Sequence, residues 1–529
     1  MKYRWLRILR ISIAVIFFLL ISLAFLDFVG LFPDKLMKNT LWIQFVPSIL
    51  KFSRVLTFSA TGFVVILLIT LLFGRFYCAS ICPLGIFQDI ILRIARRFKK
   101  IRFKHQQPLN WIRHFILAFT VLTLLTGSVM VLNLIDPYSV FGRIFSDLFR
   151  PILIAGNNLI ATIFQSFDIY TFYHFDLYPL NWAIYITPVL FLFVISYLTV
   201  IHGRIYCNTI CPVGTLLGYL AKISVFKIRI NENSCTNCKL CERACKAECI
   251  DLENQKIDHS RCISCFNCLT SCKFNAIDFT AKKPQPSETE PLEPATPSNP
   301  QRRRALSVLL GGMVFTPAMV SAQNQEEPTK GPEVYRGATK PVKRKQYVAP
   351  PGSADVKEFL NKCTACHLCI SACPTQVIQP SKNQFGWDHI LQVRMDFKAG
   401  YCNYECTRCT EVCPTGALMP LVVEDKKLTQ LGKAHFVKEN CVVEAEGTDC
   451  GACAETCPTK AVHMVPYEDD LKIPEVDDTI CIGCGACEHV CPTIPYKAIY
   501  VEGNVVHVMA DKPKEEKAEK PDHEGDFPF

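Results

Sequence analysis

The stretch that decides the fold of this 529-residue chain is Cys481-Ile482-Gly483-Cys484-Gly485-Ala486-Cys487-Glu488-His489-Val490-Cys491-Pro492. Its spacing, C-x2-C-x2-C-x3-C, recurs in full or in modified form five more times along the chain. The six quartets use 24 of the 29 cysteines: Cys235, Cys238, Cys241 and Cys245; Cys262, Cys265, Cys268 and Cys272; Cys363, Cys366, Cys369 and Cys373; Cys402, Cys406, Cys409 and Cys413; Cys441, Cys450, Cys453 and Cys457; and Cys481, Cys484, Cys487 and Cys491.

This spacing is typical of chains that bind [4Fe–4S] clusters. Three closely spaced thiolates in a tight loop hold three irons of a cubane, and the fourth cysteine usually ligates the other cluster of a pair. We therefore expect Cys272 to complete the Cys235 cluster and Cys245 to complete the Cys262 cluster. Zinc is the competing interpretation, but zinc sites use two separated cysteine pairs rather than runs of four. The prediction is six [4Fe–4S] clusters, with all 24 cysteines as ligands.

Three features depart from the regular pattern. The spacing is longer in two quartets, Cys402-x3-Cys406 and Cys441-x8-Cys450. Which quartets exchange cysteines among the last four stays open. Cys249 belongs to no quartet, and we expect it to be a packed thiol rather than a ligand.

The first half of the chain carries four long apolar runs, over residues 11–32, 55–73, 111–135 and 181–201. Each is long enough to cross a bilayer as a helix. Thirteen basic residues lie on the N-terminal segment and the loop after the second run, against six on the two opposite loops. Because basic loops stay in the cytoplasm, both ends of this unit are expected there. The sequence thus predicts an α-helical membrane domain of four helices over residues 1–230.

An internal repeat lies within this unit. Residues 74–85 read GRFYCASICPLG, and residues 203–214, which lie 129 positions further on, read GRIYCNTICPVG. The repeat carries two C-x3-C-P motifs, with Cys78 and Cys82 in the first and Cys207 and Cys211 in the second. The four thiols are expected to form a redox or metal site, either by converging on one metal or cluster or by forming redox disulfides. The alternative is that they are simply buried where Pro and Gly turn the chain.

The remaining segments follow from composition. We expect a cytoplasmic two-cluster α+β ferredoxin-like domain over 231–280, a Pro-rich linker over 281–300 and a tether over 323–352. A four-cluster ferredoxin-like domain over 353–510 and a charged, disordered tail over 511–529 would follow. Between linker and tether, residues 301–322 begin with Arg302-Arg303-Arg304 and continue into an apolar run. This stretch is expected to be a twin-arginine-like signal or a fifth, anchoring helix, which would place the four-cluster domain in the periplasm. The alternative is a surface helix that leaves this domain inside.

Several function classes are excluded. The net charge of +9 comes without an Arg-rich strip interleaved with aromatics, so no nucleic-acid partner is expected. The sequence has no Gly-rich dinucleotide fingerprint, P-loop or G-x-S-x-G motif, which disfavours nicotinamide, ATP and hydrolase chemistry. A chain of this length is also no small disulfide scaffold.

With these motifs, residues 1–280 resemble the NapH-type membrane ferredoxin-type proteins of the periplasmic nitrate reductase system. Residues 300–505 resemble the NapG-type exported four-cluster proteins of the same system, so the chain resembles a fusion of the two. The resemblance implies a quinol dehydrogenase component of anaerobic respiration, multi-pass in the bacterial inner (cytoplasmic) membrane. It would take quinol from the quinone pool as substrate and pass electrons to a periplasmic reductase or cytochrome.

Two residues are candidates for a direct role in such a reaction. Asp136 and His174 are candidate proton acceptors for quinol, and no catalytic residue is assigned. The alternative function is an assembly or maturation redox factor for a respiratory metalloenzyme.

Overall fold

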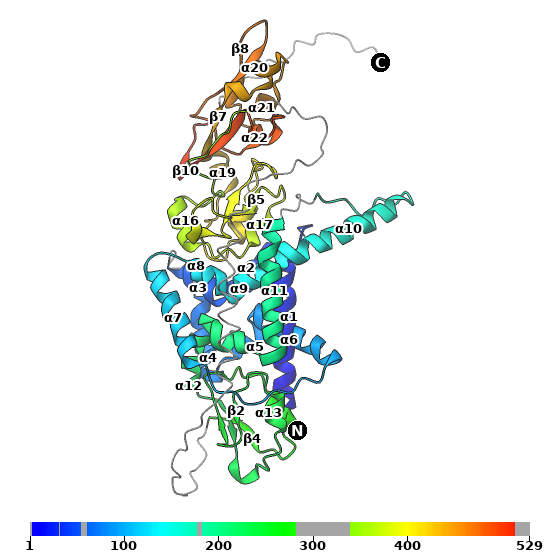
Figure 1. Ribbon diagram of the computed structural model, residues 1–529, viewed down its shortest axis with the longest axis vertical. Helices are drawn as coiled ribbons and strands as arrows, with labels where there is room; N and C mark the ends of the chain where they lie inside the picture. Colours follow the sequence, from blue (N-terminus) through cyan, green and yellow to red (C-terminus); the bar gives the residue numbers. More distant parts are fainter. Residues whose placement is uncertain (1–2, 31, 54–60, 177–181, 282–338, 514–529) are drawn as a thin grey trace.

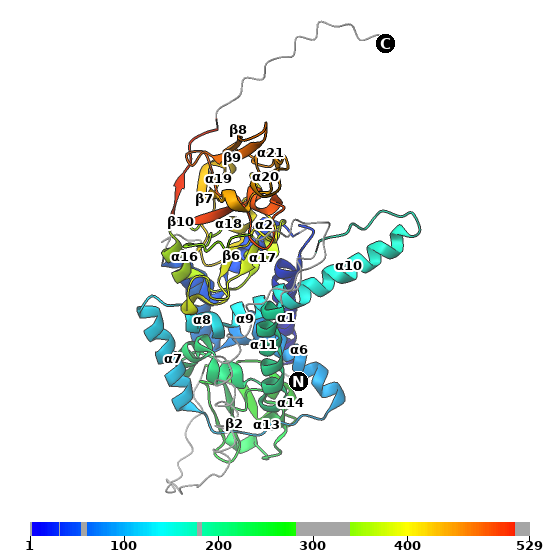
Figure 2. The ribbon, with the colours of Figure 1, turned by 45° about the horizontal axis from the view of Figure 1, so that its top comes forward.

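The computed structural model describes residues 3–30, 32–53, 61–176, 182–281 and 339–513. A helical unit forms the middle of an elongated molecule, with a two-cluster domain (residues 227–280) at one end and a four-cluster domain (residues 339–510) at the other (Figures 1 and 2). Apart from their edges, the expected linker, signal or anchor helix and charged tail, and the first half of the tether, lie outside the described residues.

The helical unit consists of helices and short π-helical turns. They are α1 (Arg4–Leu26), α2 (Asp34–Trp42), α3 (Phe45–Phe52), α4 (Gly62–Phe73), α5 (Phe76–Ser80), α6 (Pro83–Phe98), α7 (Asn110–Leu125), α8 (Met130–Ile135), α9 (Pro137–Arg143), η2 (Ile144–Phe149), α10 (Arg150–Gln165), α11 (Trp182–His202), η3 (Tyr206–Ile210) and α12 (Pro212–Lys222).

The expectation of four membrane-spanning helices, or five with the anchor, is wrong for the described residues. Two helical stretches there are long and apolar enough to cross a bilayer, Arg4–Leu26 and Tyr185–His202, while α4 and α7 are apolar but shorter. The run over 111–135 is divided between α7 and α8, because the chain turns at Gly127, whose φ is +84°. A left-handed glycine ends a helix at little cost, and hydropathy alone does not detect this break.

The starts of α6 and α12 show why the repeat folds twice in the same way. Each helix has the second cysteine of a C-x3-C-P motif as its N-cap, followed by the proline at its first position. Proline suits this position because its fixed φ matches a helix and its missing N–H has no partner to lose. Both cysteines are therefore held at helix N-termini.

The two-cluster domain is a small α+β fold. It contains β1 (Lys227–Ile230), η4 (Glu232–Ser234), α13 (Leu240–Ala244), β2 (Ile250–Asp251), β3 (Lys256–Ile257), α14 (Asn267–Ser271) and β4 (Ile277–Thr280). Strand β1 pairs with β4 antiparallel, with Ile228 opposite Phe279, and β2 pairs with β3. Helices α13 and α14 pack against each other between the two hairpin-like pairs.

The four-cluster domain repeats this scheme with additions. It contains α16 (Val356–Lys362), α17 (Leu368–Ala372), β5 (Ile378–Pro380), η5 (Trp387–His389), β6 (Val393–Met395), α18 (Arg408–Val412), α19 (Val423–Leu428), β7 (Thr429–Phe436), η6 (Lys438–Asn440), α20 (Val442–Glu446), α21 (Ala452–Glu455), β8 (Val462–Pro466), β9 (Lys472–Val476), α22 (Ala486–Val490) and β10 (Ile499–Met509). Antiparallel pairs form between β5 and β6, β8 and β9, and β7 and β10. Helix α17 packs on α18, and α21 packs on α22.

A carboxylate in α6 ties the helical unit to the two-cluster domain. Asp89 forms ion pairs with Arg204 (2.6 Å), with Arg10 of α1 (3.3 Å) and with Lys246 of the two-cluster domain. Burial alone would raise the pKa of Asp89, but Arg204 and Lys246 beside it lower that pKa well below its ordinary value. One carboxylate therefore forms ion pairs with cations from three separate segments.

Asp89→Asn should lower stability by about 3–5 kcal/mol, because it leaves three buried cations without their shared counter-charge. The readout is the midpoint of thermal loss of visible cluster absorbance in detergent. The control is Glu405→Gln, which removes the exposed ion pair between Glu405 and Lys427 and should leave the midpoint unchanged. Equal midpoints for the two variants would contradict the anchoring role of Asp89.

Candidate iron–sulfur centres

Four of the six quartets share one loop conformation. In each, the residues immediately before and after the second cysteine have positive φ, for example Ala365 (51°) and His367 (63°) around Cys366. The same pattern surrounds Cys238, Cys265 and Cys484. Alternating right- and left-handed backbone turns successive N–H groups to one side, which creates an anion-binding concavity. The loops are thus shaped to surround a group that carries negative charge.

Backbone N–H groups in these loops donate to the thiols. The N–H of Ala365 donates to Cys363, and that of Leu368 donates to Cys366. In the same way, the N–H groups of Gly483 and Ala486 donate to Cys481 and Cys484. A side chain at Gly483 would lie 2.5 Å from the backbone of Gly432, so the loop packs too tightly there for any Cβ. The donor set therefore fits sulfur ligands and their charge.

The two-cluster domain gathers its eight quartet cysteines in exchanged sets. One cavity is lined by Cys235, Cys238 and Cys241 together with Cys272, the last cysteine of the second quartet. The other cavity is lined by Cys262, Cys265 and Cys268 together with Cys245, the last cysteine of the first quartet. The ferredoxin-type spacing predicts this exchange, because the fourth cysteine of each quartet lies outside the loop that carries the first three.

The four-cluster domain shows the same exchange twice. Cys413 lies close enough to Cys363, Cys366 and Cys369 to act on their charge, and Cys373 does so for Cys402 and Cys409. In the second half, Cys491 joins Cys441 and Cys453, and Cys457 joins Cys481, Cys484 and Cys487. The quartets thus pair first with second and third with fourth.

The two irregular quartets owe their spacing to local structure. The eight residues between Cys441 and Cys450 contain helix α20, which ends at Gly447 with φ +63°. In the Cys402 quartet, the ammonium group of the buried Lys426 donates to the carbonyls of Asn403 and Tyr404, which lie between Cys402 and Cys406. The insertions therefore lengthen the loops while the cysteines still reach the site.

Cys249 lies at the second cavity of the two-cluster domain. It is buried, and its Sγ is 3.6 Å from that of Cys245. It therefore adds a fifth thiol to the four that line the cavity as an exchanged set.

Most of the quartet thiols are buried, and burial favours the protonated form of thiols such as Cys363 and Cys453 before iron arrives. Burial raises the pKa of Cys363 to about 12 and that of Cys453 to about 12. Because iron and zinc bind thiolates, cluster insertion must displace these protons. The residues present fit [4Fe–4S] clusters, which supply one-electron redox chemistry when bound.

The helical unit meets the four-cluster domain beside its first cluster loop. Arg143 donates to the carbonyl of Ala365 (3.3 Å), and Asp147 contacts the ring of His367 (2.7 Å). A Cβ on Gly142 would lie 2.3 Å from the carbonyl oxygen of Cys366, so the two backbones touch. Sequence reasoning missed this interface, because its two sides are more than 200 positions apart and Gly142, Arg143 and Asp147 belong to no motif.

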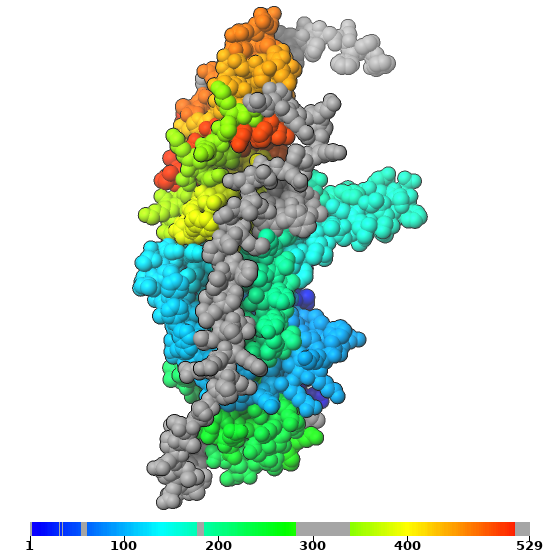
Figure 3. All heavy atoms as spheres, in the orientation of Figure 1, coloured from blue at the N-terminus to red at the C-terminus, as the bar shows by residue number. Residues whose placement is uncertain are grey.

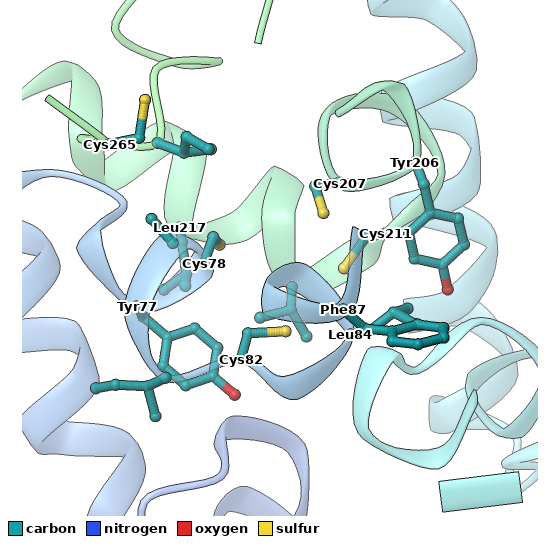
Figure 4. Close-up of a cluster of buried hydrophobic side chains, with 14 of the residues drawn as sticks. Tyr77, Cys78, Cys82, Leu84, Phe87, Tyr206, Cys207, Cys211, Leu217 and Cys265 are labelled. Atoms are coloured by element: carbon teal, nitrogen blue, oxygen red, sulfur yellow. The ribbon is translucent and has the colours of Figure 1, made fainter. Parts of the chain in front are cut away.

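The four C-x3-C-P thiols converge in the centre of the helical unit. Cys78, Cys82, Cys207 and Cys211 are all buried and free, and Figure 4 shows them among Tyr77, Tyr206 and Cys265. Sequence reasoning gave no role to Arg75 and Arg204, although each stands three positions before a first cysteine of the repeat. Their recurrence at equivalent positions was the available signal.

Two family models match the segments of the chain that contain these cysteine motifs. A family model described as a 4Fe-4S binding domain matches residues 55–102 and 183–231, which contain the two C-x3-C-P motifs. A model described as a 4Fe-4S dicluster domain matches residues 362–417 and 448–494 in the four-cluster domain. The matches and the quartets support a ferredoxin-type [4Fe–4S] protein that transfers electrons.

Known relatives are similar to this chain over part of its length. The methylamine utilization ferredoxin-type protein MauM of Methylobacillus flagellatus is 29% identical over 155 residues, which cover 27% of this chain and 64% of MauM. The ferredoxin-type protein NapF of Escherichia coli is 26% identical over 136 residues, 26% of this chain and 74% of NapF. The putative electron transport protein YccM of Escherichia coli is 25% identical over 193 residues, 34% of this chain and 44% of YccM. The chain thus spans just under two thirds of MauM, and no solved structure matches it.

Double substitutions test the exchanged pairing in the four-cluster domain. Cys363→Ala with Cys413→Ala should cost about four iron atoms per chain, since both cysteines serve one cluster, whereas Cys363→Ala with Cys373→Ala should cost about eight. Iron and protein are quantified on full-length chain purified without oxygen. The reverse order of losses would show that each quartet holds its own cluster.

Proposed function

We propose that this chain is a membrane-bound quinol dehydrogenase component that relays electrons to a redox partner, a reductase or cytochrome of the periplasm. The observation that carries the proposal is the position of the helical unit between two cluster-binding domains, in contact with both (Figure 1). Arg75 donates to the carbonyl of Ser260 in the two-cluster domain (3.0 Å), while Ser146 contacts Ser371 of the four-cluster domain (2.8 Å).

The surface of the helical unit supports a membrane location. Helix α1 has 23 residues and is therefore about 34 Å long, which matches a hydrocarbon core of about 30 Å. Large apolar side chains are exposed along α1, α7 and α11, among them Leu19, Leu23, Phe115, Leu122, Val189 and Phe193. Helix α10 projects from the body (Figure 3) and exposes Ile152, Leu159 and Ile163, as expected of a helix lying in the membrane interface.

The distribution of basic residues gives the proposed orientation. The basic N-terminal segment and the loop after α6 lie at the end of the molecule that holds the two-cluster domain, which would face the cytoplasm. The four-cluster domain would then face the periplasm, in keeping with the resemblance to a NapH–NapG fusion. Localisation in the inner membrane follows from this orientation.

A group of buried polar side chains lies near the boundary with the four-cluster domain. Asp136, Tyr138 and Asn133 each have a buried polar atom without a hydrogen-bond partner among the described residues. Tyr138 lies within reach of the charges of Asp136 and of Cys366. Such a group is suited to bind the two oxygens of a quinol ring close to the first cluster of that domain.

Asp136 is the proposed proton acceptor in this reaction. Quinol loses two electrons and two protons to become quinone. The electrons pass singly towards the partner, which is reduced; one proton goes to the Asp136 carboxylate and the other is released to water. Burial raises the pKa of Asp136 to about 6, against the opposing effects of Ser139 and Arg143. His174, the other candidate, is exposed on the loop after α10, where its ring contacts Gln165.

Asp136→Asn should slow cluster reduction by quinol at least tenfold, because the amide cannot accept the proton. In the unaltered chain, the quinol rate should rise as pH increases through about 6, since only the deprotonated carboxylate accepts a proton. Cluster bleaching is followed anaerobically in detergent, and reduction by dithionite, which delivers no proton, serves as the control. An unchanged quinol rate and pH profile in the variant would exclude Asp136 from this role.

Quinol-dependent reduction of a mature, separately purified partner separates a relay from a maturation factor. A relay should reduce the mature partner, whereas a factor needed only for assembly should not. Failure to reduce the clusters with any quinol would contradict the proposed function.

A further inference from the structure

The four thiols of the C-x3-C-P repeat form one site with approximate twofold symmetry. Each of the thiols Cys78, Cys82, Cys207 and Cys211 lies within range of charge–charge interaction with the other three. They are 4–5% exposed, although they come from segments 129 residues apart (Figure 4). The two halves of the repeat therefore form a single site rather than two separate motifs.

Two buried arginines cross between the halves of this site. Arg75 of the first repeat donates to the carbonyl of Cys207 (2.7 Å), and Arg204 of the second donates to the carbonyl of Cys78 (3.3 Å). Each guanidinium also approaches the first cysteine of its own repeat, at 3.9 Å for Cys78 and 3.8 Å for Cys207. Two positive charges thus flank the thiols inside the core.

The buried positive charge of Arg75 requires an anionic neighbour. It is fully buried, yet its hydrogen bonds at 3.5 Å or less go to Asn208 and to the carbonyls of Ser260 and Cys207, none of which carries a charge. Its Nε has no hydrogen-bond partner among the described residues. A disulfide is neutral and would leave this charge unbalanced, whereas four thiolates around a cluster carry net negative charge.

Backbone groups add to this positive environment. The second cysteine of each motif is the N-cap of a helix, Cys82 for α6 and Cys211 for α12, so both helix dipoles direct their positive ends at the site. The N–H of Gly214 donates to the Sγ of Cys211 (3.3 Å), and the N–H of Gly85 donates to Cys82. A Cβ at Gly85 or Gly214 would meet the opposite arginine at 2.7 Å, so this geometry requires glycine.

The central thiols resemble the six quartets in one respect, the distance between possible ligands. Across the part of the chain that the structure describes, no three His, Cys, Asp or Glu side chains lie close enough to share one metal ion, and this includes the six quartets as well as the central thiols. Ligands of a polynuclear cluster stand further apart, because each binds a different iron. The 4Fe-4S binding-domain matches also cover these two segments, which lie outside the quartets.

We propose that Cys78, Cys82, Cys207 and Cys211 together bind a seventh cluster, a [4Fe–4S] cubane in the centre of the helical unit. This site does not depend on quinol being the substrate. It lies in the same buried core as Cys265 of the two-cluster domain and Cys366 of the four-cluster domain. A cluster there would take one electron from one side and release one electron to the other, with no net change of its own.

The first test is the iron content of the unaltered full-length chain, purified in detergent without oxygen. Seven cubanes predict about 28 iron atoms per chain, and six predict about 24. The number of clusters is also counted by Mössbauer spectroscopy, which separates cubanes from smaller clusters. About 24 iron atoms with the six quartets filled would overturn the proposal, and so would about 26 with a two-iron cluster.

The second test removes the site. Cys82→Ala with Cys211→Ala should cost about four iron atoms per chain and leave the other clusters in place. The matched control is Ser80→Ala, which alters a buried residue between the two cysteines of the first motif and should cost none. Unchanged iron content in the cysteine variant would overturn the proposal, and if that variant loses all its clusters by misfolding, the count on the unaltered chain decides.

Failure of this site is distinguishable from failure of the proposed function. Iron content and Mössbauer spectra require neither quinol nor a partner, so the seventh cluster stands or falls without an activity measurement. Conversely, if a chain with seven clusters is reduced by no quinol, the proposed cluster site stands and the proposed quinol substrate is excluded.

Discussion

The crossing of Arg75 and Arg204 between the two repeats is the interaction on which the arrangement of the molecule depends. Burying two guanidinium groups is costly unless their hydrogen bonds are made and their charge is balanced. Each arginine makes those bonds across the repeat, so neither half can be positioned without the other. Arg75 also reaches Ser260, and Arg204 reaches Asp89, which binds Lys246. The same two side chains therefore position the central thiols and fix the two-cluster domain beneath them.

This packing places redox groups along the whole molecule. A bilayer core of about 30 Å is wide for a single electron transfer, so clusters at the two ends need something between them. The central thiols lie in the core that joins both cluster domains. At the opposite boundary, Gly142 lets the backbone of α9 touch the loop that carries Cys366. Polar contacts such as those of Arg75 and Arg143 therefore join the cluster domains to the helical unit, alongside the hydrophobic core that all three share.

Much of the site could be predicted from the sequence, because cluster ligands obey short, rigid spacing rules. The quartets and the exchange between Cys245 and Cys272 follow from how far a tight loop can reach around a cubane. The repeat around Cys78 and Cys207 was equally visible. The lengths of the apolar helices could not be predicted, because Gly127 breaks a run whose hydropathy is continuous. Asp89 and the contact of His367 with Asp147 were also beyond reach, because tertiary pairs over long separations leave no local pattern.

The most direct test of a relay across a membrane is the sidedness of the two cluster domains. One epitope is inserted in the exposed β2–β3 turn after Asn254, and another in the exposed β8–β9 turn after Asp469. Antibody binding is compared on intact and permeabilised spheroplasts. The account predicts that the β8–β9 epitope is bound on intact spheroplasts and that the β2–β3 epitope is bound only after permeabilisation. Protection of both epitopes until permeabilisation would contradict it, because all clusters would then lie on one side.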